Sequence, residues 1–288
     1  MTGDFRVNPS AIEFPKLKET EENGIIQMRQ RKTSLHSQIA YLLAQRIIRG
    51  ELLPGQNLPD VEDMRAEFGV SRTVLREAVK LLTAKGIVAS KPRIGMTVRA
   101  RRGWSLLDQE LLMWRVDAGI DKAFFQDLIG LRRVIEPGIA ELAAQQGTDS
   151  ELEHILTLYK RLEATVDQPD DFVVNDMRFH TMMIEASHNE LLQPIRQPIG
   201  VAILAIARTT AQVPGSSRAA LPIHKAVAES IKTRDSAQAH ELMHQLVMEA
   251  AHDIDTFLSQ LDHQPEKQLL LAEASAGIGD FLAKHLVS

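Results

Sequence analysis

The chain has 288 residues, 44% of them hydrophobic and only 5% aromatic, with no cysteine and a net charge of −5. This length allows two modest domains, the composition favours helices over sheets, and the lack of cysteine excludes disulfides and thiolate chemistry. No apolar run is long enough to span a bilayer and the first residues lack the plan of a signal peptide, so we expect a cytoplasmic protein with no membrane partner.

Charge is divided unevenly along the chain. Residues 29–102 carry 15 Lys and Arg against 6 Asp and Glu, a net charge of +9. Residues 103–288 carry 15 against 27, a net charge of −12, and the first 28 residues carry −2. A basic segment beside an acidic one indicates two separate tasks, one of which is binding a polyanion.

Regular patterns begin after residue 32, and residues 1–32 are predicted to form a flexible tail because they are polar and aperiodic. A first helix should follow a cap at Thr33 or Ser34, where apolar residues start to recur three and four positions apart. A second, short helix is expected in "VEDMRAEF", capped by Asp60 and closed by Gly69.

The third predicted helix lies in "FGVSRTVLREAVKLLTAKG", which is apolar along one side and begins with hydrogen-bond donors. Ser71 should cap this helix and Gly86 should close it. The next stretch, "IVASKPRIGMTVRA", predicts two short strands around a turn at 92–95. Three helices followed by a small hairpin are the plan of a winged helix-turn-helix, which we assign to residues 33–102.

The arginines of the third helix suit DNA recognition, because a recognition helix buries its back and presents its N-terminal turn to the major groove. Arg72 and Arg76 lie four apart on one face, and arginine can bind guanine O6 and N7 together. Hydroxyls near the helix start suit phosphate oxygens, and basic wing residues suit the DNA backbone. The alternative is a basic helix that is merely solvated. The predicted DNA-contacting residues are Ser71, Arg72, Thr73, Arg76, Lys80, Lys91 and Arg93, with added charge from Arg99.

From about residue 106 to 261 the pattern is helical throughout, so residues 103–262 are predicted to form an antiparallel all-helical bundle, followed by an extension at 263–288. No βαβ pattern or glycine-rich phosphate loop is present, which argues against a Rossmann or P-loop enzyme. The predicted helices cover roughly 106–117, 122–146, 150–166, 170–187, 190–212, 217–233 and 235–261.

The run "LPGQNLP…AEFGVSRTVLREAVKLLTAKGIV…GMTV" resembles the winged helix-turn-helix of GntR-type regulators, and the helical remainder resembles the FCD ligand domain of the FadR subfamily. The resemblance covers roughly residues 33–261. It implies that Arg72 and Arg76 contact bases and that Arg93 to Gly95 form the wing tip, which adds Gly95 to the predicted DNA contacts. One departure is Glu62, which stands where the family often has a DNA-contacting arginine.

A candidate metal site involves Asp176 and His180, which lie four apart on one helix face, and His224 on a later helix. Taken alone, these histidines could equally be surface or packed residues. The resemblance implies that FCD domains bind a divalent metal through such a pair and two further histidines. The fourth position here is Leu246, and His244 is two residues away on another face. Three ligands leave open coordination positions, and Zn²⁺ is our first expectation, with Ni²⁺, Mn²⁺ or Fe²⁺ as alternatives.

A candidate effector contact is Arg132, four residues before Glu136. The two could form an exposed ion pair, but the resemblance implies that the arginine faces the cavity and binds a carboxylate. A buried, unpaired arginine would need an anion to meet it. Asn189 and Arg208 are further candidate effector contacts. Family members that respond to sugar acids, such as galactonate repressors, resemble this chain here and in "WSLLDQELLMWRVDAG".

These features predict a homodimeric, non-enzymatic transcription regulator, most simply a repressor, that binds a pseudo-palindromic duplex operator and releases it on binding a small carboxylate or sugar acid. One alternative is a metal-dependent enzyme, because two histidines and one carboxylate resemble the ligands of non-haem iron oxygenases. Another is an architectural DNA binder without a ligand.

Overall fold

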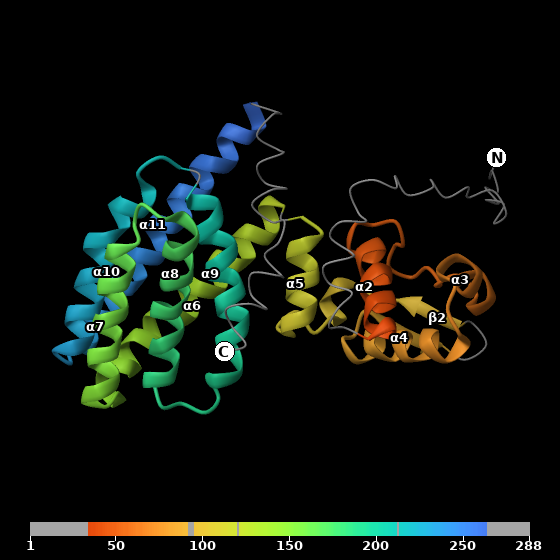
Figure 1. The fold of residues 1–288 in the computed structure, drawn as a ribbon, viewed down its shortest axis with the longest axis horizontal. Helices are drawn as coiled ribbons and strands as arrows, with labels where there is room; N and C mark the ends of the chain where they lie inside the picture. The colour runs from red at the N-terminus through yellow and green to blue at the C-terminus, as the bar shows by residue number, and fades with distance from the viewer. Residues whose placement is uncertain (1–33, 92–94, 120, 212, 264–288) are drawn as a thin grey trace, which may run out of the picture.

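The computed structural model describes residues 34–91, 95–119, 121–211 and 213–263 and shows two helical bodies joined by a short helix (Figure 1). The N-terminal body contains three helices and a two-stranded hairpin, and the C-terminal body is a bundle of long helices. The predicted mainly α fold, a winged helix-turn-helix followed by a helical bundle, is therefore confirmed. The predicted tail at 1–32 and nearly all of the extension at 263–288 lie outside the described residues.

The helices of the N-terminal body are α2 (Leu35–Ile48), α3 (Val61–Phe68) and α4 (Arg72–Ala84). Ser34 and Ser71 cap α2 and α4, because their hydroxyls accept hydrogen bonds from backbone N–H groups of the first turn. Gly69 ends α3 with a φ of +63°, a left-handed conformation that glycine adopts without strain and that permits the tight turn into α4. Asp60 occupies the N-cap position of α3, but its side chain makes no capping hydrogen bond there.

The hairpin consists of β1 (Val88–Lys91) and β2 (Gly95–Val98), paired antiparallel with Lys91 opposite Gly95. It occupies the predicted position of the wing, while the intervening turn with Arg93 falls outside the described residues. The apolar sides of the three helices and the hairpin share one core, which includes Ile39, Leu43, Met64, Leu75, Leu82, Val88 and Val98.

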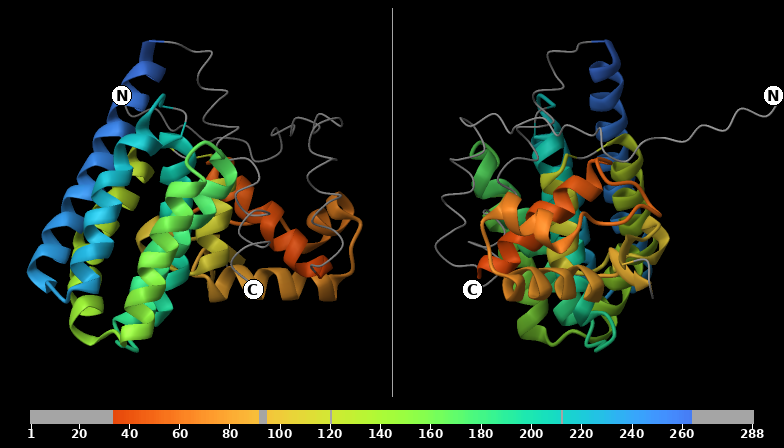
Figure 2. Two further views of the ribbon diagram at one scale, coloured as in Figure 1. Left: turned by 60° about the vertical axis from the view of Figure 1, so that its left-hand side comes forward. Right: turned by 90° about the vertical axis from the view of Figure 1, so that its right-hand side faces the viewer.

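The bundle contains long helices that run alongside one another in each of the turned views (Figure 2). Its core is rich in aliphatic residues and includes two fully buried rings, Phe125 and Phe179. The bundle helices are α6 (Lys122–Gln146), α7 (Asp149–Ala164), α8 (Pro169–Ala186), α9 (Arg196–Thr210), α10 (Ser216–Lys232) and α11 (Ser236–His263).

Two helices begin later than expected. Helix α5 (Gln109–Asp117) starts where the Asp108 carboxylate accepts a hydrogen bond from the Leu111 N–H, so the cap fixes its first turn. Helix α9 starts at Arg196 rather than near residue 190. Before it, Asn189 Oδ1 accepts a hydrogen bond from the Leu191 N–H, and this local turn competes with helix formation.

Helix α5 belongs to both bodies. Leu111 and Trp114 pack in the N-terminal core, whereas Leu112 and Val116 pack in the bundle core. The Gln45 side-chain amide donates to the Trp114 carbonyl at 2.9 Å. A movement of α5 with the bundle would therefore also displace side chains in the core of the N-terminal body.

The end of α4 is tied to the start of α5 as well. The buried ammonium of Lys85, the C-cap residue of α4, lies 2.6 Å from Asp108 and 2.9 Å from Glu110. These are strong, short ion pairs at the junction between the two bodies. Among the described helices, none combines the length and apolar character needed to cross a membrane.

Candidate nucleic-acid interface and metal centre

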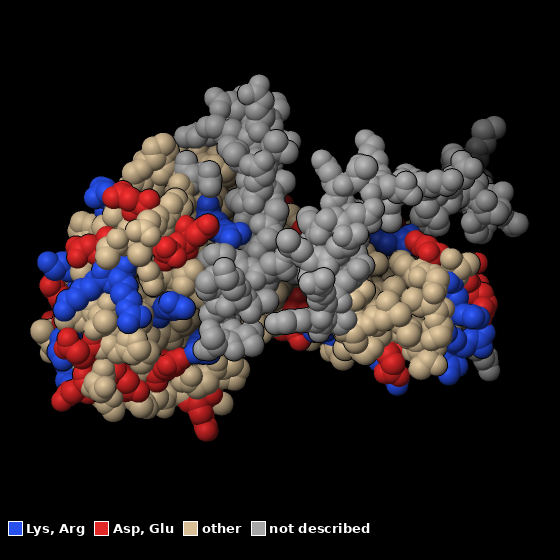
Figure 3. Space-filling model, viewed as in Figure 1, with Lys and Arg blue, Asp and Glu red and all other residues tan. Residues whose placement is uncertain are grey.

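The first turn of α4 forms an exposed polar face. Ser71, Arg72, Thr73 and Arg76 are all exposed, while Leu75 on the opposite side is buried. In Figure 3, Lys and Arg side chains gather at the outer end of the N-terminal body, among a few Asp and Glu. The predicted base- and phosphate-contacting residues of α4 are thus brought together on one accessible surface.

Carboxylates engage part of this basic surface. Glu62 of α3 accepts from Arg72 through Oε1, and its Oε2 lies 2.7 Å from Arg65. The ammonium of Lys80, another predicted DNA contact, lies 2.7 Å from Glu77. Glu62 stands at the position where related proteins often have a DNA-contacting arginine. In this chain its carboxylate instead forms an ion pair with Arg72 of α4.

The hairpin supplies the other predicted contacts. Lys91 ends β1, and Gly95 begins β2 with a φ of +100°, a conformation suited to glycine at a turn. The structure therefore provides a wing beside α4, although the predicted contacts themselves remain predictions.

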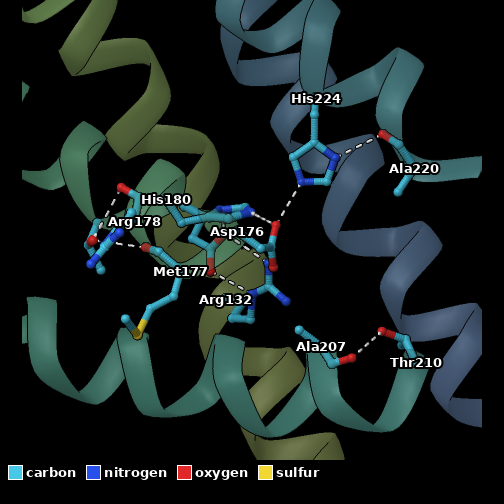
Figure 4. Close-up of polar contacts among 11 residues, drawn as sticks. Arg132, Asp176, Met177, Arg178, His180, Ala207, Thr210, Ala220 and His224 are labelled. Carbon is cyan, nitrogen blue, oxygen red and sulfur yellow. Dashed lines mark hydrogen bonds and ion pairs between the residues drawn. The ribbon is translucent and has the colours of Figure 1, made fainter. Parts of the chain in front are cut away.

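The three predicted metal ligands meet in the bundle. Asp176 and His180 project from successive turns of α8 and His224 from α10, and their side chains point toward one another (Figure 4). One potential ligand atom from each lies within 4.8 Å of the others, and all three residues are buried. His224 Nε2 lies 2.9 Å and His180 Nε2 3.6 Å from Asp176 Oδ1. This donor set, two imidazoles and a carboxylate, fits a divalent transition metal.

An acceptor lies beside the Nδ1 atom of each imidazole. His224 Nδ1 lies 2.8 Å from the Ala220 carbonyl oxygen, which can only accept, so Nδ1 carries the proton and Nε2 faces the site. His180 Nδ1 lies 2.8 Å from Glu136 Oε2, within ion-pair distance but without the geometry of a hydrogen bond, and Nε2 faces Asp176. Metal-binding histidines in proteins are commonly held by such carbonyl and carboxylate partners. The sequence indicated Glu136 only as a partner of Arg132 and did not indicate its position beside His180.

Arg132 and Glu136 form a buried pair. Arg132 Nε donates to Glu136 Oε1 at 2.6 Å and Nη2 donates to Oε2 at 3.3 Å, with each residue only 3% exposed. The alternative of an exposed ion pair is therefore wrong, and so is the idea that Arg132 lacks a partner inside the protein. Charge neutrality around Arg132 does not by itself require a bound anion.

The buried charges stabilise one another. Burial alone would raise the pKa of Glu136, but Arg132 and His180 lower it to about 2. Burial would lower the pKa of His180, but Glu136 and Asp176 raise it to about 9. The two histidines likewise hold the pKa of Asp176 well below its usual range against the effect of burial. Without a metal, Arg132 and protonated His180 therefore contribute positive charge to this centre.

A cavity of about 350 Å³ opens beside these residues. Leu246, at the family's fourth ligand position, lines the cavity with the three candidate ligands and Arg132, whereas His244 does not line it. Five further polar residues line the cavity and were not predicted from the sequence: Ser216, Ser217, Glu249, His252 and Asp253. Glu249 and Asp253 follow Leu246 on α11 by three and seven residues, and this helical spacing could have indicated them.

Two predicted effector contacts lie elsewhere. Asn189 lies in the turn after α8, where its side chain accepts the hydrogen bond from the Leu191 N–H. Burial lowers the pKa of Arg208 on α9, and the nearby charge of Asp170 offsets part of this effect. Neither residue lines the cavity described above.

Comparison with known families matches residues 35–98 to bacterial regulatory proteins of the gntR family and residues 127–249 to the FCD domain. An uncharacterised HTH-type transcriptional regulator, YieP of Escherichia coli, is 39% identical over 156 residues, which cover 54% of this chain and 68% of YieP. The galactonate operon transcriptional repressor of the same organism is 28% identical over 212 residues, covering 70% of this chain and 89% of the repressor.

A solved structure of Lar, which controls expression of the Listeria monocytogenes agr system, has the same fold. It matches with a TM-score of 0.53 at 20% identity, covering 76% of this chain and 98% of that one. These relatives are transcriptional regulators rather than enzymes, so the oxygenase-like alternative is set aside. The chain belongs to the GntR family of bacterial transcriptional regulators and combines a gntR-type DNA-binding domain with an FCD domain.

Proposed function

We propose that this regulator is a homodimeric repressor that binds a short pseudo-palindromic operator and leaves it when a small organic or sugar acid binds beside a divalent metal in the bundle. One observation carries the proposal. Three buried ligand atoms lie within 4.8 Å of one another at a cavity of about 350 Å³, and Leu246 contributes no fourth ligand.

Asp176, His180 and His224 would hold the metal, with Zn²⁺ the first candidate because imidazole and carboxylate ligands suit it. When bound, the ion supplies positive charge and open coordination positions that a carboxylate can use. The hydrogen bond to the Ala220 carbonyl keeps His224 turned toward the site, and the Glu136 carboxylate lies within ion-pair distance of His180.

Arg132 would contact the effector while keeping its hydrogen bonds to Glu136. A guanidinium has five N–H donors, and the two hydrogen bonds to Glu136 use Nε and Nη2. The remaining donors at the cavity wall suit a carboxylate or hydroxyl oxygen.

Other polar residues that line the cavity favour hydroxyl groups over a second carboxylate. Glu249 and Asp253 are acceptors that would repel another negative charge and accept from hydroxyls, and Ser216 adds a hydroxyl already bonded to Asp253. A polyhydroxy monoacid therefore fits better than a dicarboxylate. The similarity to the galactonate operon transcriptional repressor of Escherichia coli supports this class of effector.

Operator binding would use the α4 face and the wing. Arg72 and Arg76 would contact bases, Ser71 and Thr73 phosphates, and Lys80, Lys91, Arg93 and Gly95 the backbone around them. One recognition helix contacts only a few base pairs, so two copies on a two-fold-symmetric site would supply the required specificity. Helix α5, which packs in both cores, would carry a ligand-induced movement of the bundle to α4.

The metal is tested by elemental analysis of untagged protein. We expect about one divalent ion per chain in the wild type and in His240→Ala, a control at an exposed histidine paired with Glu141. The Asp176→Ala, His180→Ala double variant should contain none. Undiminished metal in the double variant would place the site elsewhere.

The effector is tested by a thermal-shift screen of small organic and sugar acids against metal-loaded and chelated protein, because a ligand that binds the folded state raises its melting temperature. We expect shifts from polyhydroxy monoacids only when metal is present. Equal shifts from the chelated protein would contradict a metal-assisted effector site.

A further inference from the structure

Glu62 is a negative residue beside the predicted DNA-contacting residues of α4. Its carboxylate reaches from α3 to the recognition helix, where Oε1 accepts from Arg72, and its other oxygen lies 2.7 Å from Arg65 on its own helix. The side chains of Glu62 and Arg72 are 58% and 57% exposed, so the pair lies at the surface that would meet DNA.

Fold stability does not explain this pair. Exposed ion pairs stabilise proteins only slightly, since solvent screens them and ordering two long side chains costs entropy. The packing of α3 against α4 is already secured by buried Met64 and Leu75, which belong to one core. A carboxylate at this place also repels phosphates, so it weakens the attraction to DNA of any sequence.

We infer that Glu62 is a positioning residue for Arg72 that increases base discrimination at the expense of general DNA affinity. Its carboxylate engages one Nη of the guanidinium and restricts the side chain's rotamers, which leaves other N–H donors for a guanine edge. Less side-chain entropy is then lost on binding the correct base. The inference rests on the proposed operator reading by α4.

The chain offers a matched control on the same surface. Glu77 of α4 is also an exposed carboxylate in an ion pair, with Lys80 at 2.7 Å, but it does not contact either predicted base-reading arginine. Removing Glu77 changes the local charge by the same amount as removing Glu62. The two variants therefore separate the effect of charge from the effect of orienting Arg72.

The experiment begins with selection of duplexes by the full-length protein from a randomised DNA library. Dissociation constants are then measured at one fixed salt concentration on the selected duplex, on its single-base variants and on random-sequence duplex. The proteins compared are the wild type, Glu62→Ala, Glu77→Ala, Arg72→Ala and the Glu62→Ala, Arg72→Ala double variant.

We expect Glu62→Ala to lower the preference for the base pair read by Arg72 by about fivefold or more, the lower range of one bidentate contact. It should also bind random duplex more tightly. Glu77→Ala should share the second effect but keep the base preference. In the Arg72→Ala background, removing Glu62 should change the base preference no further.

An unchanged base preference in Glu62→Ala, or equal losses of preference in Glu62→Ala and Glu77→Ala, would overturn the inference. So would a further loss of preference on removing Glu62 when Arg72 is already absent. If the wild-type protein enriches no sequence, the proposed operator binding by α4 is itself wrong, and the inference about Glu62 is wrong with it. This outcome differs from an enriched sequence whose base preference does not depend on Glu62, which would overturn only the inference.

Discussion

The recognition surface and the bundle centre both contain arginines paired with carboxylates, but in opposite surroundings. The Arg72 and Glu62 side chains are more than half exposed, whereas Arg132 and Glu136 are each 3% exposed. An exposed pair can exchange its partner for DNA or water with little change in free energy. A buried pair must be satisfied inside the protein, because one charge left alone in the interior is costly.

The difference in exposure assigns the two pairs different roles: the exposed pair is available to contact DNA, and the buried pair stabilises the interior of the bundle. At the surface of α4, charged side chains are available to a partner, and substituting one should change the stability of the fold little. In the bundle, Arg132, Glu136, His180 and Asp176 form a continuous chain of ion-pair contacts. The centre is therefore preorganised before any ligand enters.

The largest effect is expected when the buried chain is broken. Glu136→Ala leaves Arg132 buried without its carboxylate and should lower the free energy of unfolding by about 3–5 kcal/mol. Chemical denaturation of the metal-free protein measures this value. A loss below about 1 kcal/mol, typical of an exposed pair, would show that water reaches Arg132.

A second large effect should appear with pH in the metal-free protein. The pKa of His180 is raised from 6.5 to about 9, so its stabilising contribution is complete below pH 6.5 and is lost as pH rises through 9. The free energy of unfolding should fall by about 3 kcal/mol over this range on account of His180. Denaturation at several pH values, with a chelator present, tests this trend.

The same titration with saturating metal provides the control. Metal binding requires deprotonated imidazole, so stability over the same range should rise with pH instead of falling. Identical pH profiles with and without metal would mean that His180 is not a ligand.

An intermediate effect is expected at the DNA surface. Arg76→Ala should weaken binding to the selected operator by about 1–3 kcal/mol and binding to random duplex much less, because a bidentate base contact is lost. Fluorescence anisotropy with both duplexes gives the two values. Equal losses would show that Arg76 contacts only phosphate.

The smallest effect is expected for an exposed pair remote from both sites. Arg218 lies 2.6 Å from Asp167, and their side chains are 63% and 81% exposed. Asp167→Ala should change the free energy of unfolding by less than about 1 kcal/mol. A larger loss would remove the contrast between exposed and buried pairs on which the preceding comparison depends.

Local signals predicted much of this structure. The spacing of apolar residues gave α6 its observed bounds, and in the structure Asp121 accepts a capping hydrogen bond from the Phe124 N–H at its start. The four-residue interval between Asp176 and His180 predicted their shared face. These features depend on interactions within one helix, which sequence spacing describes well.

Contacts between helices were less accessible to sequence reasoning. Glu136 reaches His180 only because α6 packs beside α8, and no spacing along the chain encodes that distance. The four-residue interval left open whether Arg132 and Glu136 pair at the surface or inside, and only the packing of α6 in the bundle buries the pair. The salt bridge from Glu62 to Arg72 similarly depends on how α3 crosses α4.

The central claim, that the bundle site controls DNA release, is tested most directly by operator affinity with and without effector. Anisotropy would follow the selected duplex with metal-loaded wild type, chelated wild type and metal-loaded Leu246→His, which adds a fourth ligand beside the acid. The acid with the largest thermal shift should weaken operator binding of the loaded wild type by about 5–150-fold, the usual range of allosteric coupling. The chelated protein should not respond, and Leu246→His should respond less. Equal release by all three proteins would contradict the account.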